Sequence, residues 1–181
     1  MLIIQKTTIV FKCKLVLIFL ILCSNYTQSQ ENKDRDSLLI SSARELITSS
    51  KTCALITVDE NNIPAVRTMD PFMPDEDFNI WFGTNPHSRK VAQIRNNPNV
   101  TLYYLDKDTT GYVVVHGRAE LVEFDREHSN YWKEEWEAFY PNPDKDYMLI
   151  KVIPTQLEII SESRNILGDS KTWKAPVVLF N

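Results

Sequence analysis

The sequence predicts a mainly β protein whose strands form a small, closed or partly closed antiparallel barrel with peripheral helices. Short runs of strand-forming residues follow one another through most of the chain, and turn residues separate them closely. The helix-like segments are few and lie between or outside these runs. Antiparallel strands with short turns and peripheral helices are typical of small barrels. A β-sandwich is the alternative that the same pattern allows.

The N-terminal residues 1–29 have the features of an export signal. Three lysines precede the apolar run 15–22, which is too short to span a bilayer comfortably, and small residues follow at the spacing that signal peptidases recognise. We predict cleavage near Ser29, so that residues 30–181 form one domain of an exported, periplasmic or secreted protein without stable membrane association. A lipoprotein attached at Cys23 and an uncleaved anchor are the alternatives.

The composition of the mature chain excludes some classes of partner. Without the three leader lysines, 17 basic residues stand against 24 acidic ones, so the net charge is near −7. This balance argues against nucleic acid, because a phosphate backbone requires a broad basic face. Only Cys53 remains of the three cysteines, so no intrachain disulfide is possible. Its apolar neighbours predict that Cys53 packs in the core.

A helix and a hairpin open the predicted domain. Apolar residues recur at helical spacing over 37–49, with Asp36 as a plausible cap and the charged residues 31–36 as a polar lead-in. The strand-like runs 53–58 and 63–69 enclose the turn Asp-Glu-Asn-Asn. This arrangement predicts a β-hairpin with a longer loop.

A third strand, 78–82, leads into a short helix that carries the most informative residues. Asn85 is a good N-cap residue and Pro86 suits the first helical position, so we predict that the helix begins there and ends before Asn97. The predicted first turn holds unpaired backbone N–H groups and the positive end of the helix dipole. Both features favour an anion.

The side chains around this helix start match that expectation. Thr84 and Ser88 supply hydroxyls, and Arg89 and Lys90 supply two cations. Together with the free N–H groups they predict an anion site best suited to a phosphate. An ordinary helix start with hydrated basic residues is the alternative interpretation.

The second half of the chain predicts four more strands and one helix. The predicted strands span residues 100–105, 112–122, 148–153 and 156–160. The helix spans 125–140 and places aromatic residues on one side. The tail after residue 160 is irregular apart from the apolar residues 177–180.

Two strand residues have more than one interpretation. Arg67 lies in the middle of an otherwise apolar strand, where it either reaches water from a sheet edge or points at the same anion as Arg89 and Lys90. Trp81 alternates with its neighbours on the third strand and so faces the side opposite to Phe82. It either belongs to the core or flanks a flat ring.

Five motifs in order carry a resemblance to a known superfamily. They are Arg67–Met69, Ile80–Thr84, Ser88–Ile94, Asn97–Val100 and Val115–Leu121. Their order and spacing resemble pyridoxamine 5'-phosphate oxidase-like, flavin-binding split barrels, most of all the general stress protein branch. The resemblance implies a six- or seven-stranded antiparallel split barrel that forms a homodimer with FMN bound at the subunit interface.

The resemblance also implies roles for individual residues. Ser88, Arg89 and Lys90 would hold the FMN phosphate with help from Arg67. The ribityl chain or the flavin ring would be lined, partly through backbone groups, by Thr68, Met69, Trp81, Phe82 and Thr84. Gln93 could reach polar atoms of the ribityl chain or the ring. Trp173 would either cover the flavin from the partner subunit or anchor the tail on the barrel, the second being the better interpretation.

The function expected from this resemblance is a flavin-dependent oxidoreductase with an unknown electron donor and acceptor. A non-catalytic flavin carrier or stress-related sensor is the alternative, and a barrel with a purely structural role is a third. FAD or a deazaflavin could replace FMN. The oxidase of this superfamily that makes pyridoxal phosphate carries an arginine-bearing C-terminal motif that grips its substrate's phosphate. The resemblance therefore does not imply pyridoxal phosphate synthesis, because no arginine follows Arg164. No residue pattern indicates a catalytic acid or base, a metal site or haem ligation.

Overall fold

The computed structural model of the protein describes residues 26, 28, 30–107, 110–125 and 127–180. The chain divides into two compact units, Met1–Leu38 and Leu39–Asn181. Residues 30–38 of the first unit and 39–49 of the second are helical, so helical structure begins before the predicted cap and includes the predicted lead-in. The predicted cleavage site at Ser29 lies outside the described residues, as does nearly all of the predicted leader.

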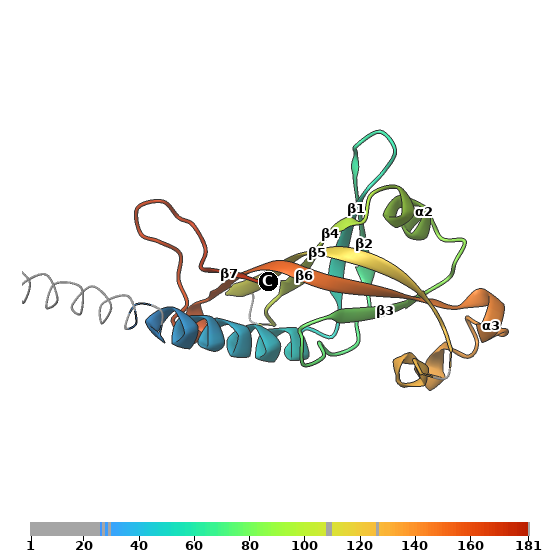
Figure 1. The fold of residues 1–181 in the computed structure, drawn as a ribbon, viewed down its shortest axis with the longest axis horizontal. Helices are drawn as coiled ribbons and strands as arrows, with labels where there is room; N and C mark the ends of the chain where they lie inside the picture. Colours follow the sequence, from blue (N-terminus) through green and yellow to red (C-terminus); the bar gives the residue numbers. More distant parts are fainter. Residues whose placement is uncertain (1–25, 27, 29, 108–109, 126, 181) are drawn as a thin grey trace, which may run out of the picture. The chain divides into compact units, whose positions relative to one another are not determined.

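Seven antiparallel strands form one curled sheet in the second unit (Figure 1). They are β1 (Cys53–Val58), β2 (Pro64–Met69), β3 (Ile80–Thr84), β4 (Asn99–Leu105), β5 (Gly111–Glu123), β6 (Met148–Ser161) and β7 (Val177–Leu179). The strand order is β2-β1-β4-β5-β6-β3, and β7 also pairs with β6. The sheet curls into a half-barrel with β2 and β3 at its edges, which confirms the predicted split-barrel fold class.

The two strands predicted at 148–153 and 156–160 are one long strand, β6. The sequence suggested a break because Pro154 cannot donate a ladder hydrogen bond. The sheet absorbs the proline in an irregularity of the ladder, where His116 pairs with Gln156 while Gly117 pairs with Pro154. The uninterrupted β6 pairs with β5 on one side, and with β3 and then β7 on the other.

The main core lies on the inner face of this sheet. Alternate residues of the strands are buried there, as the period of two requires. Leu39, Ala43, Leu46 and Ile47 from the helical residues 39–49 join the same cluster. Cys53 is also buried in it, as predicted, and burial raises the pKa of its thiol to about 12.

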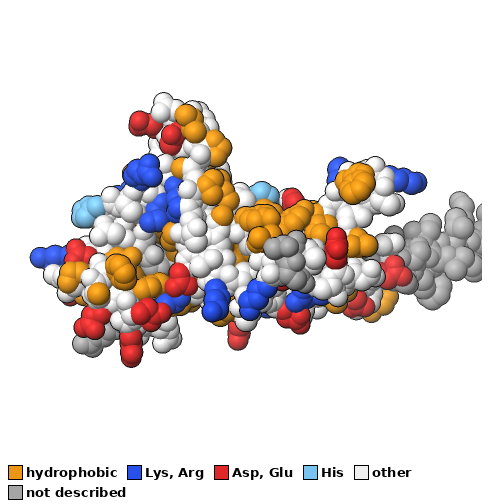
Figure 2. All heavy atoms as spheres, turned by 180° about the vertical axis from the view of Figure 1, so that it is seen from behind, with side chains coloured by type: hydrophobic (Ala, Val, Ile, Leu, Met, Phe, Trp, Pro, Cys, Tyr) orange, Lys and Arg blue, Asp and Glu red, His pale blue; other side chains and the backbone are white. Residues whose placement is uncertain are grey.

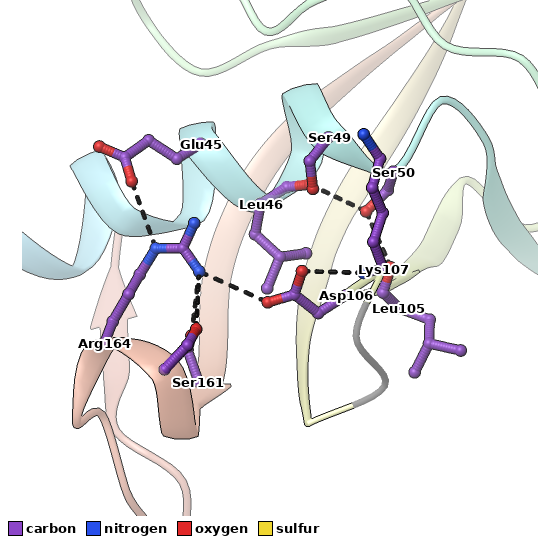
Figure 3. Close-up of polar contacts among 10 residues, drawn as sticks. Glu45, Leu46, Ser49, Ser50, Leu105, Asp106, Lys107, Ser161 and Arg164 are labelled. Carbon is purple, nitrogen blue, oxygen red and sulfur yellow. Dashed lines mark hydrogen bonds and ion pairs between the residues drawn. The ribbon is translucent and has the colours of Figure 1, made fainter.

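A polar network around Arg164 joins three parts of this unit (Figure 3). Arg164 follows β6 in the short 3₁₀ helix η3, Glu162–Arg164. Its Nε atom lies 3.2 Å from a carboxylate oxygen of Glu45, and its Nη1 atom lies 3.4 Å from Oδ2 of the buried Asp106. It also donates to the Ser161 hydroxyl at 3.1 Å. The network therefore links residues 39–49, the end of β4 and the end of β6.

The prediction of a helix at 125–140 is wrong. The structure has two 3₁₀ turns, η1 (Ser129–Tyr131) and η2 (Glu134–Trp136), followed by the short helix α3 (Pro143–Asp146). The Asp125 carboxylate accepts the N–H groups of Glu127 and His128 in a tight turn instead of capping a helix.

Tertiary packing of aromatic rings explains this departure. Tyr131, Trp132 and Trp136 pack with Phe72 and Tyr147 in a second hydrophobic cluster that is separate from the main core. Short 3₁₀ turns turn these rings toward the cluster from several directions, whereas a regular helix would align them along one stripe. The aromatic spacing predicted burial correctly but not the backbone conformation.

Candidate functional site

The helix after β3 is shorter than predicted. Helix α2 spans Arg89–Asn96 and has Ser88 at its N-cap position. Asn85 does not cap it, because the Asn85 side-chain oxygen accepts the N–H of His87 at 2.8 Å in a separate turn. The prediction of a helix start at Pro86 is therefore wrong, because an asparagine side chain can stabilise a turn as well as a helix end. Arg89 and Lys90 become the first two helical residues.

Arg67 from the edge strand β2 is tied to two other elements. Its guanidinium donates to the Thr57 hydroxyl at 2.7 Å and to the Gln93 side-chain oxygen at 2.8 Å. It also donates to the backbone oxygen of Leu55 at 3.2 Å. Because β1 supplies Thr57 and α2 supplies Gln93, the arginine joins β1, β2 and α2. It does not simply extend from the sheet edge into water.

Lys90, next to Arg89 at the start of α2, is hydrogen-bonded to the end of β3. Its ammonium donates to the Thr84 hydroxyl at 3.0 Å, and Thr84 and Ser88 place their hydroxyl oxygens 3.3 Å apart. Thr84 is buried at the end of β3. Thr84, the last residue of β3, thereby fixes the position of the Lys90 ammonium group.

The positive charges of Arg67, Arg89 and Lys90 act on one another; we call these three residues the cationic cluster. Burial lowers the pKa of Lys90, and the charge of Arg67 lowers it further. Burial also lowers the pKa of Arg67, with a second contribution from the charge of Arg89. None of the ion pairs in the described part of the chain involves these three side chains. Like charges gathered without an ion-pair partner among the described residues favour an anionic ligand.

A groove of about 510 Å³ lies beside the cationic cluster. Arg89, Gln93 and Asn96 of α2 line one part, and Asp59 and Glu60 of the β1–β2 turn line another. The two carboxylates repel an anion, so an anion in this groove is favoured on the side of α2, where Arg89 lies. The groove leaves Arg89 and Gln93 accessible to a ligand.

The residues predicted to line a sugar or flat ring are not all in one place. Phe82 is fully buried in the main core, so only its backbone could contact a ligand. Trp81 faces the opposite side, as its alternation predicted, and its ring stacks on Tyr131 with 4.4 Å between centroids. Met69 packs against the main core, and Thr68 is exposed.

Sequence reasoning missed Thr57. This side chain is buried and shares the Gln93 oxygen with Arg67, accepting from the arginine and donating to the amide oxygen at 2.6 Å. A signal was present, because Thr57 follows Cys53 and Leu55 at the inward-facing positions of β1. A polar residue in such a series requires a hydrogen-bond partner inside the protein.

Trp173 does not anchor the tail on the barrel, so that interpretation is wrong. Its side chain is 87% exposed, and its backbone has a left-handed φ of 59°. The loop around it is held by its own hydrogen bonds, with the Asp169 carboxylate accepting the N–H groups of Lys171 and Thr172. The loop therefore presents the indole ring to solvent.

The described residues contain neither a helix that could span a membrane nor a cluster of side chains that could hold a metal ion. No helix in the ranges given above is long and apolar enough to cross a membrane. Within the same ranges, no three His, Cys, Asp or Glu side chains gather closely enough to hold a metal ion.

The fold and the cationic cluster together define an antiparallel split barrel with three neighbouring cations at the helix after β3. The profile of the family described as Pyridoxamine 5'-phosphate oxidase like matches residues 40–168, and the chain belongs to this family. The resemblance inferred from the five motifs is thus confirmed. No curated protein sequence matches the chain significantly.

Solved structures share the fold at low sequence identity. General stress protein 26 from Bacillus anthracis is 29% identical with a TM-score of 0.58, covering 66% of this chain and 92% of its own. A protein related to general stress protein 26, from Clostridium acetobutylicum, is 23% identical with a TM-score of 0.61, covering 80% and 95%. A pyridoxamine 5'-phosphate oxidase-related, FMN-binding protein from Nostoc punctiforme is 17% identical with a TM-score of 0.52, covering 80% and 94%.

Proposed function

We propose that the chain binds FMN and holds the FMN phosphate at the cationic cluster. The observation that carries this proposal is the convergence of Arg67, Arg89 and Lys90 with no carboxylate in ion-pair distance among the described residues. Partly burying like charges raises the free energy of the ligand-free protein, and a phosphate dianion offsets that cost. Membership of the family and the fold shared with an FMN-binding protein favour a flavin nucleotide over a simple anion.

The neighbouring residues suit the rest of such a ligand. The Ser88 hydroxyl and the N–H groups of Arg89 and Lys90 are donors for phosphate oxygens, whereas those of Val91 and Ala92 already donate to the Ser88 carbonyl. The Gln93 side-chain oxygen is already used by Thr57 and Arg67, which leaves the amide nitrogen to donate to a ribityl hydroxyl or a ring carbonyl. The arginine and the threonine thus orient this amide.

The chemistry that we propose is a flavin-dependent redox reaction. A bound flavin supplies the hydride-accepting ring, and the protein supplies placement and electrostatics. The cationic cluster would place the ring by fixing the phosphate at the opposite end of the cofactor. A carrier that holds the flavin without turnover is the alternative, since no described side chain stands out as a general acid or base.

We also propose that two copies of the chain pair through the outer face of the sheet. Register places Ile56, Tyr103, Val114 and Tyr112 on the face opposite the main core. Exposed Val66 and Leu105 lie on the same sheet face as these four residues. Figure 2 shows a group of hydrophobic side chains near the middle of the face in view. A sheet face can meet a second copy of itself across a two-fold axis.

The phosphate assignment is tested with the double variant Arg89→Ala/Lys90→Ala. Two charge-assisted contacts of roughly 1.5–3 kcal/mol each would be lost, which weakens FMN binding by about two to four powers of ten. Fluorescence titration with FMN measures the loss, and riboflavin, which lacks the phosphate, reports the contribution of the ring alone. Riboflavin affinity should change little.

Arg95→Ala is the matched control, because Arg95 is an exposed cation in the last turn of the same helix. It should bind FMN as the unchanged protein does. Equal FMN affinity in the double variant and the control would contradict the assignment. Anaerobic bleaching of the bound flavin by NADH or NADPH, followed by reoxidation with a dye, then distinguishes the oxidoreductase from the carrier.

A further inference from the structure

A second hollow, of about 570 Å³, lies among the 3₁₀ turns after β5, and none of the residues predicted to bind flavin lines it. We call it the aromatic groove. Phe124, Trp132 and Tyr140 form its ring-bearing walls, two prolines complete them, and Glu134 and Glu137 carry the charge. Its volume is in the range of small-molecule sites.

The three rings are held at angles around the same space. The centroids of Phe124 and Trp132 are 5.9 Å apart with a 36° angle between planes, and those of Trp132 and Tyr140 are 6.2 Å apart at 60°. Buried Tyr147 contacts all three from behind, with centroid distances of 4.9 Å, 5.0 Å and 4.9 Å. Tyr147 is itself part of the second hydrophobic cluster, so the packing of that cluster supports the three rings.

The charged residues among the described lining of the aromatic groove are both acidic. None of the described residues that line it is a lysine, arginine or histidine. The carboxylates of Glu134 and Glu137 are exposed and take part in none of the ion pairs among the described residues. A neighbouring hollow shares Phe124 and Ser129 and adds Asp144 and Asp125, the last of which lies 2.7 Å from Nδ1 of His128. Within the described part of the chain, the groove therefore combines electron-rich rings with two carboxylates that have no ion-pair partner.

The same aromatic cluster already holds a cation on another side. The ammonium of Lys133 lies 5.0 Å from the ring centre of Trp136 and 5.2 Å from that of Phe72, and it is 2.6 Å from an Asp70 carboxylate oxygen. Rings and a carboxylate thus bind an alkylammonium group within this protein. The aromatic groove offers the same two components, but no lysine of the described chain fills it.

We propose that the aromatic groove binds a small organic cation with an alkylammonium head, of the quaternary ammonium class. Ring faces attract such a head through their quadrupoles, and carboxylates at the mouth add a longer-range attraction. An anion would meet repulsion from Glu134 and Glu137, and a neutral apolar ligand would gain nothing from them. This inference goes beyond the proposed flavin site and does not depend on it.

Choline is the probe, and the four tryptophan indole N–H signals of the ¹⁵N-labelled protein are the readout. The spectrum of Trp132→Phe assigns the Trp132 signal. Choline chloride should shift that signal in a saturable manner and leave the exposed Trp173 signal in place. Sodium chloride at the same ionic strength should produce no saturable shift. The neutral isostere of choline, with a tert-butyl group in place of trimethylammonium, should produce none either.

The carboxylates are tested with Glu134→Gln/Glu137→Gln, which should weaken choline binding roughly threefold to tenfold. The matched control is Glu135→Gln, because this exposed glutamate stands between them in sequence but does not line the groove. Its choline affinity should be unchanged. An equal saturable shift with the neutral isostere would overturn the proposal, and so would the absence of a saturable shift with choline. Equal affinities of the double variant and the control would also overturn it.

Discussion

Lys90 illustrates how burial and a neighbouring charge act on one side chain. Both lower its pKa below the ordinary lysine value of 10.5. In the ligand-free protein the charged form is therefore disfavoured by the fold, and raising the pH through the lowered pKa stabilises the protein relative to its unfolded state. For a bound phosphate the sign is opposite, because the ligand requires the protonated ammonium.

The pH dependence of FMN binding follows from this sign. Affinity should fall by about tenfold or more as the pH rises through the lowered pKa of Lys90, since one charge-assisted contact is lost. In Lys90→Arg the cation stays protonated at these pH values, so the decline should disappear. Fluorescence titrations at several pH values measure both proteins, with riboflavin as the control for titration of the ring. Identical pH profiles for the two proteins would contradict the role given to Lys90.

Gly83 shows how a single residue allows two neighbouring elements to pack closely. A Cβ atom at this position in β3 would collide with the rings of Tyr147 and Trp136. Because Tyr147 is buried and supports the whole second hydrophobic cluster, the collision has no easy relief. The glycine is therefore required by close packing and not by an unusual backbone angle.

A side chain at position 83 should push β3 away from the aromatic rings that it contacts. Gly83→Ala should lower the free energy of unfolding by roughly 1–3 kcal/mol, as overpacking does, and alter the near-UV circular dichroism of the aromatic cluster. Gly168→Ala is the control, because its Cβ would meet backbone atoms only at ordinary contact distances of 3.4 Å and beyond. It should change stability by less than about 0.5 kcal/mol. Urea unfolding measures both, and equal stability of the two variants would refute the steric argument.

The Arg164 network gives a second prediction about how elements are joined. In Arg164→Ala, the Asp106 side chain, only 9% exposed, loses its ion-pair partner, and we expect a loss of about 1–3 kcal/mol in unfolding free energy. Glu45→Ala removes only the exposed half of the network, where such a pair contributes about 0.5 kcal/mol. Thermal and urea unfolding measure both variants. A Glu45 variant as unstable as the Arg164 variant would contradict this division.

Local patterns predicted the strands well because alternation and turn residues act over a few positions. The phosphate-binding candidates at Arg89 and Lys90 could be recognised in the same way. The bonds from Arg67 to Thr57 and Gln93 could not, because they join three elements that are distant in sequence. Pro154 within β6 and the 3₁₀ turns after β5 were missed for a related reason: sheet pairing and aromatic packing outweighed local preference.

At the scale of the whole molecule, the proposed pairing of two copies has a direct test. Tyr103 stacks on Tyr112 across β4 and β5, and both belong to the outer sheet face. Tyr103→Arg would place a charge in that face, so light scattering should report a monomer where the unchanged protein has about twice the chain mass. Leu167→Arg, at an exposed apolar residue outside the sheet, is the control and should stay paired. A monomeric unchanged protein would exclude the pairing.

The solvent-facing indole of Trp173 gives the molecule a built-in optical reporter. The other three tryptophans are buried or half-buried, so collisional quenchers such as iodide will extinguish mainly the emission from this one position. Emission from a hydrated indole lies at longer wavelength than emission from a packed one. A molecule that binds to the loop at residues 168–176 should therefore shift the Trp173 emission to shorter wavelength and protect it from iodide quenching. No added label is needed to detect this binding.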